Sequence, residues 1–193
     1  EMRMQTFMMK ELFSIIEGLP RPDLVTRELG TQAYKFLQQA LMQIDNGTML
    51  IFNFSDVFVM DSSFAGPSLL RLMRELVEDS YGERYIALSE ATPSTEENIT
   101  LTIQGHNLKL VLPVKEHKSI ERLLGQIEPS LTNTFEMISQ RKSMTARELA
   151  DLESIGISGA SNRLKRLYNL HLVTRIEEVT EEGRQHKYQS LMV

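Results

Sequence analysis

The chain of 193 residues is long enough for one large domain or two small ones, and 41% hydrophobic with 24% charged residues is typical of a folded globular protein. It contains no cysteine, which excludes disulfide scaffolds, thiol catalysis and thiolate-held metal sites. No apolar run approaches the roughly 18–20 residues of a membrane span. These features predict a soluble, cytoplasmic protein without a membrane partner.

The net charge of -5 is unevenly distributed along the chain. Residues 1–128 carry twelve Lys and Arg against eighteen Asp and Glu, whereas residues 129–193 carry nine against eight. An acidic surface binds polyanions poorly. Any nucleic-acid contact is therefore expected in the second part, where it depends on how the basic residues cluster.

Strand-like and helix-like segments alternate over the first part of the chain. Short apolar segments predict strands at 6–9, 12–16, 49–54, 85–88 and 108–114. The first two strands are expected to form a hairpin. Apolar residues recurring every three or four positions predict helices at 23–44, 64–77 and 119–127. This alternation predicts an α/β domain with a mixed sheet over residues 1–128.

Residues 93–104 fit two interpretations. Residues 99–103 alternate as a strand does, whereas Pro93 followed by Ser94 and Glu97 is typical of a helix start with a capping box. We favour the helix.

Residues 129–193 have a different pattern. Apolar stripes predict helices from 131, from Thr145 and from Ser158, with Thr145 and Glu148 forming a capping box. Apolar and polar residues alternate along the segments 172–176 and 186–191, which predicts two strands of a β-hairpin around a turn at 181–183. Three helices followed by a hairpin indicate a small winged-helix domain over 129–193.

Two stretches of this second part resemble a known class of protein. Residues 145–150 (TARELA) and 157–173 (ISGASNRLKRLYNLHLV) resemble bacterial and archaeal winged helix-turn-helix transcription factors. Those proteins have a small residue early in the third helix and a Gly-Leu-Val ending that leads into the wing. Here His171 stands at the glycine position, so the helix end is expected to be strained or closed differently.

The outward face of the third helix suits double-stranded DNA. Small hydrogen-bonding side chains near a helix start, followed one turn later by basic ones, match base edges and phosphates in a major groove. The predicted contacts are Ser158, Ser161, Asn162, Lys165 and Arg166, with Arg184, His186 and Lys187 on the wing. The alternative is a winged helix that docks on proteins, which the acidic residues Glu177, Glu178, Glu181 and Glu182 favour.

The first part carries a second resemblance. Residues 59–70 (VMDSSFAGPSLL) follow a buried strand and open a helix, and they resemble the Met-Asp-Ser-Ser-Gly loop of the STAS family of sulphate transporters and anti-sigma-factor antagonists. The resemblance spans about residues 4–127. It implies that Ser63, beside Ser62, matches the serine that a partner kinase phosphorylates in the antagonists. Phe64 stands where the family has glycine, and the alternative is that residues 61–63 only cap the helix.

Enzyme signatures are missing from the sequence. The four histidines are scattered, and there is no glycine-rich phosphate loop or nucleophile elbow. We therefore expect no catalysis, no cofactor and no metal site.

Together these patterns predict a prokaryotic transcription regulator in which a STAS-like domain controls a DNA-binding winged helix. The expected partners are double-stranded DNA, a kinase or ATPase-type regulator at the 60–67 loop, and a second copy of the chain in a homodimer. Two alternatives stay open. One is a partner-switching adaptor that binds proteins through both domains, and the other is a small-molecule-binding STAS module.

Overall fold

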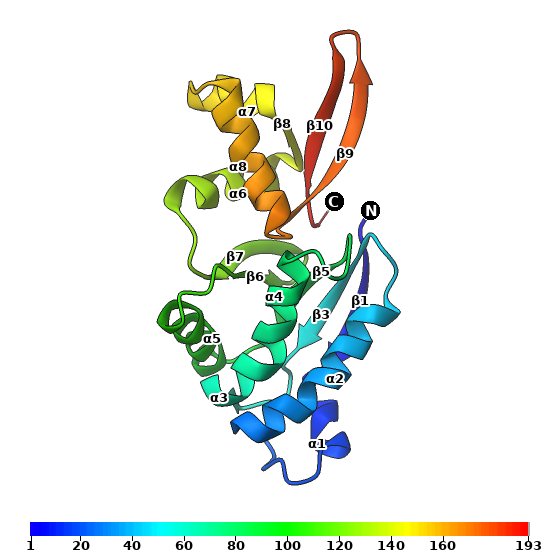
Figure 1. Cartoon of the computed structure of the whole chain (residues 1–193), viewed down its shortest axis with the longest axis vertical. Helices are drawn as coiled ribbons and strands as arrows, with labels where there is room; N and C mark the ends of the chain where they lie inside the picture. The colour runs from blue at the N-terminus through cyan, green and yellow to red at the C-terminus, as the bar shows by residue number, and fades with distance from the viewer. Residues whose placement is uncertain (193) are drawn as a thin grey trace.

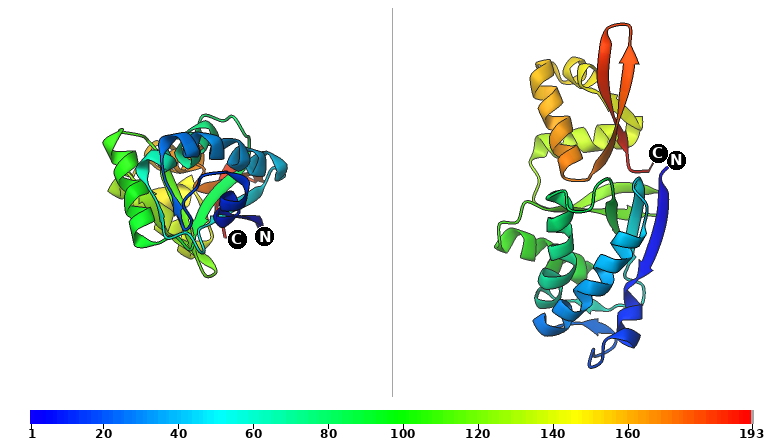
Figure 2. Two further views of the ribbon diagram at one scale, coloured as in Figure 1. Left: turned by 90° about the horizontal axis from the view of Figure 1, so that it is seen from below. Right: turned by 45° about the vertical axis from the view of Figure 1, so that its right-hand side comes forward.

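The computed structural model describes residues 1–192, apart from the side chain of Glu121, and shows a mixed α/β protein (Figure 1). Residues 1–128 form an N-terminal unit around a five-stranded sheet, and residues 129–192 form a C-terminal unit stacked on it. The two ends of the described chain lie side by side at the junction of the units (Figure 2).

The sheet of the N-terminal unit is mixed, as the sequence predicts. Its strands lie in the order β1-β3-β5-β6-β7, and only β7 runs antiparallel to its neighbour. The bounds are β1 Arg3–Met8, β3 Thr48–Asn53, β5 Tyr85–Ser89, β6 Val111–Glu116 and β7 Ser119–Gly125. The parallel pairs are joined by helical crossovers, because parallel strands cannot be connected by a tight turn.

The crossovers place helices along one face of this sheet (Figure 1). They are α1 Leu12–Ile15, α2 Arg27–Gln43, α3 Ser62–Ala65, the π-helical η2 Gly66–Leu70, α4 Arg71–Val77 and α5 Pro93–Gly105. Elements η2 and α4 continue α3 without a break, and a single turn, η1 Met9–Glu11, precedes α1. The helix favoured over 93–104 is confirmed, although Thr92 rather than Ser94 caps it by accepting from the Thr95 amide. A small parallel pair, β2 Asp23–Leu24 with β4 Val59–Met60, lies beside α5.

Two expectations for the N-terminal unit are wrong. Residues 6–9 and 12–16 do not form a hairpin, because β1 pairs in parallel with β3 and 12–15 is helical. Met9, Leu12 and Ile16 are all buried, at a spacing that a helical turn satisfies.

The second wrong expectation is the helix at 119–127, which is strand β7. The pairing with β6 passes from Val114 opposite Arg122 to Lys115 opposite Ile120, so β7 has one extra residue at this point. The bulge breaks the alternation of a regular strand, and this leaves apolar residues at the helix-like positions 120, 123 and 124.

The inner strands β3 and β5 are buried on both faces of the sheet, which explains their nearly continuous apolar sequences. Alternate residues such as Leu50, Phe52 and Ile86 pack against the helices of the N-terminal unit. Residues between them on the opposite face pack in one cluster with the core of the C-terminal unit. They are Met49, Ile51, Tyr85, Ala87, Val111 and Ile120.

The C-terminal unit has the three helices and the hairpin that the sequence predicts. The elements are α6 Pro129–Arg141, β8 Ser143–Thr145, α7 Ala146–Glu153, α8 Ile157–Asn169, β9 Val173–Thr180 and β10 Gly183–Ser190. The strands pair in the order β8-β10-β9, and the capping box between Thr145 and Glu148 is present. We call the β9–β10 hairpin the wing. In Figure 1 it projects beside α8, away from the N-terminal unit.

Candidate functional site

Helix α8 presents a polar stripe on its outer face. Ala160, Leu164 and Leu167 are fully buried, so the residues on the opposite side of the helix turn face solvent. Ser158, Asn162 and Lys165 are exposed there at three- and four-residue spacing. Of the residues predicted to contact DNA, these three share one continuous face.

Ser161 lies to one side of this stripe, in a groove between α8 and the wing. The groove has a volume of about 320 Å³, and Arg147 of α7 and Arg184 and His186 of the wing also line it. Three basic side chains, together with the carboxylate of Glu182, therefore border the space between the stripe and the hairpin. Arg147 lies 3.7 Å from the carboxylate of Glu182 at the wing tip.

Two basic side chains of the wing, Arg184 and Lys187, are each paired with a glutamate. Arg184 lies 3.5 Å from Glu177, and Lys187 lies 3.6 Å from Glu178. Ion pairs on a solvated surface contribute only about 0–1 kcal/mol, so phosphates can replace these carboxylates at little cost. Because of this pairing, the wing nevertheless has little net positive charge.

Arg166, the remaining predicted contact, points toward the link between the units. Its Nη1 and Nη2 donate to the two carboxylate oxygens of Glu128, each at 3.0 Å. This forked hydrogen bond holds the pKa of Glu128 below its ordinary value and raises that of Arg166. Arg166 follows Asn162 by one helical turn, but this bond turns its side chain toward the link, so we do not count Arg166 among the groups that face a DNA groove.

The C-terminal end of α8 is tied to the N-terminal unit on its other side. The carboxylate of Glu83 accepts hydrogen bonds from the hydroxyls of Tyr168 and Tyr85, and thus joins the two units. His171 Nδ1 lies 2.7 Å from the backbone oxygen of Arg84 and must carry the proton, since a carbonyl only accepts. Burial, and then the bond to Glu83, raise the pKa of Tyr168 to about 12.

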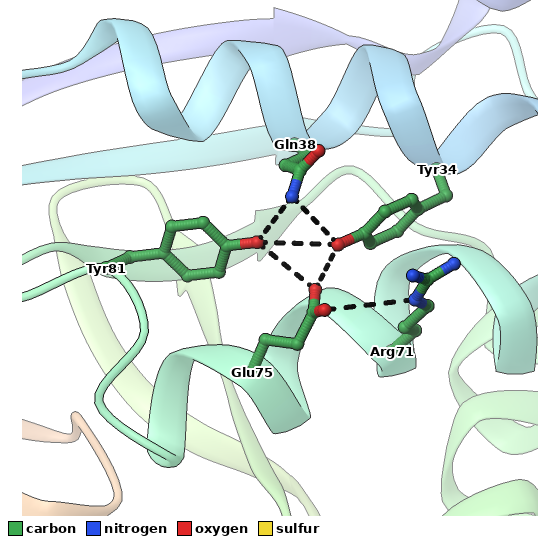
Figure 3. A network of polar contacts seen from close by, with 5 residues as sticks. All are labelled: Tyr34, Gln38, Arg71, Glu75 and Tyr81. Carbon is green, nitrogen blue, oxygen red and sulfur yellow. Dashed lines mark hydrogen bonds and ion pairs between the residues drawn. The ribbon is translucent and has the colours of Figure 1, made fainter.

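A polar network supports the loop that carries Glu83 and Arg84 (Figure 3). Gln38 of α2 donates to the hydroxyls of Tyr34 at 3.0 Å and Tyr81 at 2.9 Å, and both tyrosines donate to Glu75 of α4. Arg71 lies 3.8 Å from the ring centroid of Tyr34. Burial, and then the hydrogen bonds with Glu75 and Tyr81, raise the pKa of Tyr34. The network fastens the end of α4 to α2. Tyr81 belongs to it and directly precedes residues 82–84, so the network also holds the start of that loop.

The 60–67 loop begins the long helical run of α3, η2 and α4. Asp61 caps it, since its Oδ1 accepts from the Phe64 amide at 2.8 Å. Ser62 and Ser63 are exposed, whereas Phe64 is fully buried. Phe64 therefore fills the core and does not cover Ser63. At Gly30 of α2 a Cβ would lie 2.5 Å from the Phe64 backbone oxygen, so this glycine permits the close approach of the two helices.

Sequence reasoning missed the junction contacts of Glu83, Tyr168 and His171. The contacting pairs, Glu83 with Tyr168 and Arg84 with His171, are 85 and 87 positions apart in the sequence. Only one signal pointed to them, a histidine where a helix ending of this kind has glycine.

Neither a metal site nor a membrane-spanning helix is found in the described part of the chain. Within residues 1–192, no group of three or more His, Cys, Asp or Glu side chains is placed to hold a metal ion. None of the helices over these residues combines the length and the apolar character needed to cross a bilayer.

Comparison with known proteins gave no match at any level. No protein-family model matches the chain, and no curated protein and no solved structure is significantly similar to it.

Proposed function

We propose that this protein is a DNA-binding transcription regulator whose C-terminal unit reads the major groove with α8. The observation that carries the proposal is the exposed stripe of Ser158, Asn162 and Lys165. It lies beside a groove bordered by basic residues of α7 and the wing. A B-form major groove admits one α-helix, and the backbone phosphates beside it then meet the flanking groove.

The direction of α8 supports this role. Its last turn contacts the N-terminal unit through Tyr168, whereas its first turns lie beside the wing, where Ile157 and Ser161 line the groove. The start of the helix is thus at the end of the molecule away from the N-terminal sheet (Figure 1). In helix-turn-helix proteins it is the N-terminal part of the recognition helix that contacts bases.

The weak net charge of the C-terminal unit favours binding as a dimer. With nine basic and eight acidic residues over 129–193, one copy has little non-specific attraction for DNA. Two copies bound to half-sites about 34–36 Å apart double the base contacts without needing a more basic surface. We therefore propose a homodimer on a two-fold symmetric operator.

The test is the sequence preference of the full-length chain. Duplexes selected from a random library should share a motif, and Asn162→Ala should relax the preference at one position by about 1–3 kcal/mol. Asn133→Ala, an exposed asparagine on α6, serves as the matched control and should leave the motif unchanged. Recovery of no motif, or the same motif with Asn162→Ala, would contradict base reading by α8.

One observation favours the second candidate, a protein-docking adaptor. The wing carries Glu177 at 3.5 Å from Arg184 and Glu178 at 3.6 Å from Lys187, a mixture of charges that suits a protein surface as well as a phosphate backbone. If no duplex binds the full-length chain, the stripe on α8 becomes the docking face of that adaptor.

The 60–67 loop supports a proposal about control. Ser63 is exposed at a helix start, where free amides and the helix dipole favour a phosphate. In Figure 1, α3 lies at the end of the N-terminal unit opposite the C-terminal unit. A kinase or ATPase-type partner at this loop would therefore act through the N-terminal unit and not by covering α8.

A further inference from the structure

A second cavity lies at the junction of the two units, beside the C-terminal half of α8. It has a volume of about 450 Å³, within the range of about 300–1,000 Å³ typical of small-molecule sites. The walls come from residues 107–109, from 126–128 at the link between the units, from α6 and from α8. Domain junctions are preferred locations of such sites.

The lining combines an apolar surface with a few polar groups. Leu108, Ile127, Leu131 and Leu170 supply aliphatic contacts, and no aromatic ring lines the cavity. The charged groups are Lys109, Arg166 and Glu128, which leave one net positive charge. The remaining polar groups are the side-chain amides of Asn107, Gln126 and Asn169.

Within this cavity Glu128 occupies the place of a carboxylate ligand. Its two oxygens accept hydrogen bonds from Nη1 and Nη2 of Arg166, each at 3.0 Å. This two-pronged geometry is the one in which a guanidinium binds a carboxylate most specifically. The two side chains are 60% and 54% exposed, so their pairing contributes little to stability. A ligand carboxylate can therefore take the place of Glu128 without breaking a strong interaction.

We infer that this junction cavity binds a small aliphatic carboxylate, whose carboxylate group displaces Glu128 from Arg166. The apolar chain packs on Leu108, Ile127, Leu131 and Leu170, and Lys109 adds a second positive charge at the rim. A neutral or cationic ligand would leave the guanidinium fork unused, and a bare anion would leave the aliphatic surface unused.

Binding would alter the connection between the units. Glu128 is the residue from which α6 begins, and Arg166 lies one helical turn beyond Asn162 on α8. When a ligand displaces Glu128, the hydrogen bonds between the link and Arg166 of α8 are lost. The inference about the ligand itself does not depend on DNA binding.

Calorimetry on the full-length chain tests the inference, with octanoate as the probe. Octanoate should bind, whereas octan-1-ol, which lacks the charge, and inorganic phosphate, which lacks the chain, should bind at least about tenfold more weakly. Chemical shifts of the side-chain amides of Asn107 and Asn169 should move on addition of octanoate, because both line the cavity.

Two variants should have opposite effects on octanoate affinity. Arg166→Gln removes the fork and should weaken binding by about tenfold or more, whereas Glu128→Gln removes the internal competitor and should tighten it. Arg141→Gln, at the far end of α6, removes one positive charge outside the cavity and should change nothing.

Three results would overturn the inference. These are the absence of octanoate binding, equal binding of octanoate and octan-1-ol, and octanoate affinity that does not respond to both Arg166→Gln and Glu128→Gln. Each is measured on the protein alone, so it is distinguishable from a failure to bind DNA.

Discussion

His171 adopts a backbone conformation that normally selects glycine. Its φ of 58° follows the end of α8, where its amide bonds to the Tyr168 oxygen at 2.9 Å and the Leu172 amide bonds to the Leu167 oxygen at 3.1 Å. This is a Schellman ending, in which a residue with a side chain costs about 1–2 kcal/mol. The ring offsets that cost through the Arg84 oxygen and through the ring of Tyr85, whose centroid lies 5.7 Å away.

Substitutions at His171 separate the strain from the contact. His171→Ala keeps the strained backbone and loses the ring, whereas His171→Gly loses the ring but relieves the strain. We expect both variants to be less stable than the wild type, with the alanine variant about 1 kcal/mol below the glycine variant. Chemical denaturation measures the difference. Equal stabilities, or a more stable alanine variant, would show that the position carries no strain.

At the scale of elements, the end of α8 and the 82–84 loop are held together by a hydrogen bond that depends on pH. Burial and the bond to Glu83 raise the pKa of Tyr168 to about 12, above the ordinary value of about 10. The folded protein thus holds this proton more tightly than the unfolded chain does. The resulting stability is present below about pH 10 and is lost as the pH rises toward about 12.

Tyr168→Phe should reduce this alkaline sensitivity. The variant lacks the bond to Glu83 and should melt at a lower temperature than the wild type near pH 8. Between about pH 10 and 12 the two melting temperatures should converge, because the wild type loses a contribution that the variant never had. Thermal unfolding followed by circular dichroism at several pH values measures this. A constant difference up to pH 12 would contradict the role of the Tyr168 proton.

The sequence predicted elements well where the pattern is local. Strands at 49–54 and 85–88, the helix over 93–104 and the helices and hairpin of the C-terminal unit are all present because their apolar spacing matches one element type. The hairpin over 6–16 and the helix at 119–127 were wrong for non-local reasons. The partner of β1 lies about 45 residues away, and the bulge in β7 exists only in its pairing with β6.

The same distinction holds for the candidate site. Helical periodicity alone places Ser158, Asn162 and Lys165 on one face of α8. It does not reveal that Arg166 meets Glu128, because that pair depends on how the two units stack. The junction cavity depends on the same stacking, and no motif in the sequence marks it.

At the scale of the whole molecule, the two units share one hydrophobic cluster. Met49, Ile51 and Tyr85 of the sheet pack in the same cluster as Phe135 of α6 and Leu167 of α8. Separating the units would expose this face of the sheet to water. The apolar contact therefore couples the stability of the N-terminal sheet to that of the C-terminal unit.

We expect the full-length chain to unfold in a single transition. Phe135 is 3% exposed, and Phe135→Ala should cost about 3–5 kcal/mol. Hydrogen exchange should show this loss at the amides of β3 as well as at those of α8, because both pack on the shared cluster. Leu152→Ala, at an exposed position on α7, is the control and should leave hydrogen exchange unchanged at the amides of both β3 and α8. A loss confined to α8 would mean that the units unfold separately.

The central claim, that the C-terminal unit binds DNA with α8 and the wing, is tested most directly by the salt dependence of binding. Fluorescence anisotropy of labelled duplex DNA with the full-length chain should show an affinity that falls linearly with the logarithm of salt concentration. Lys187→Gln should lower that slope by about one, whereas Lys35→Gln, at an exposed position on α2 of the N-terminal unit, should leave it unchanged. Absence of salt-dependent binding at low ionic strength, or equal slopes for the wild type and Lys187→Gln, would contradict the claim.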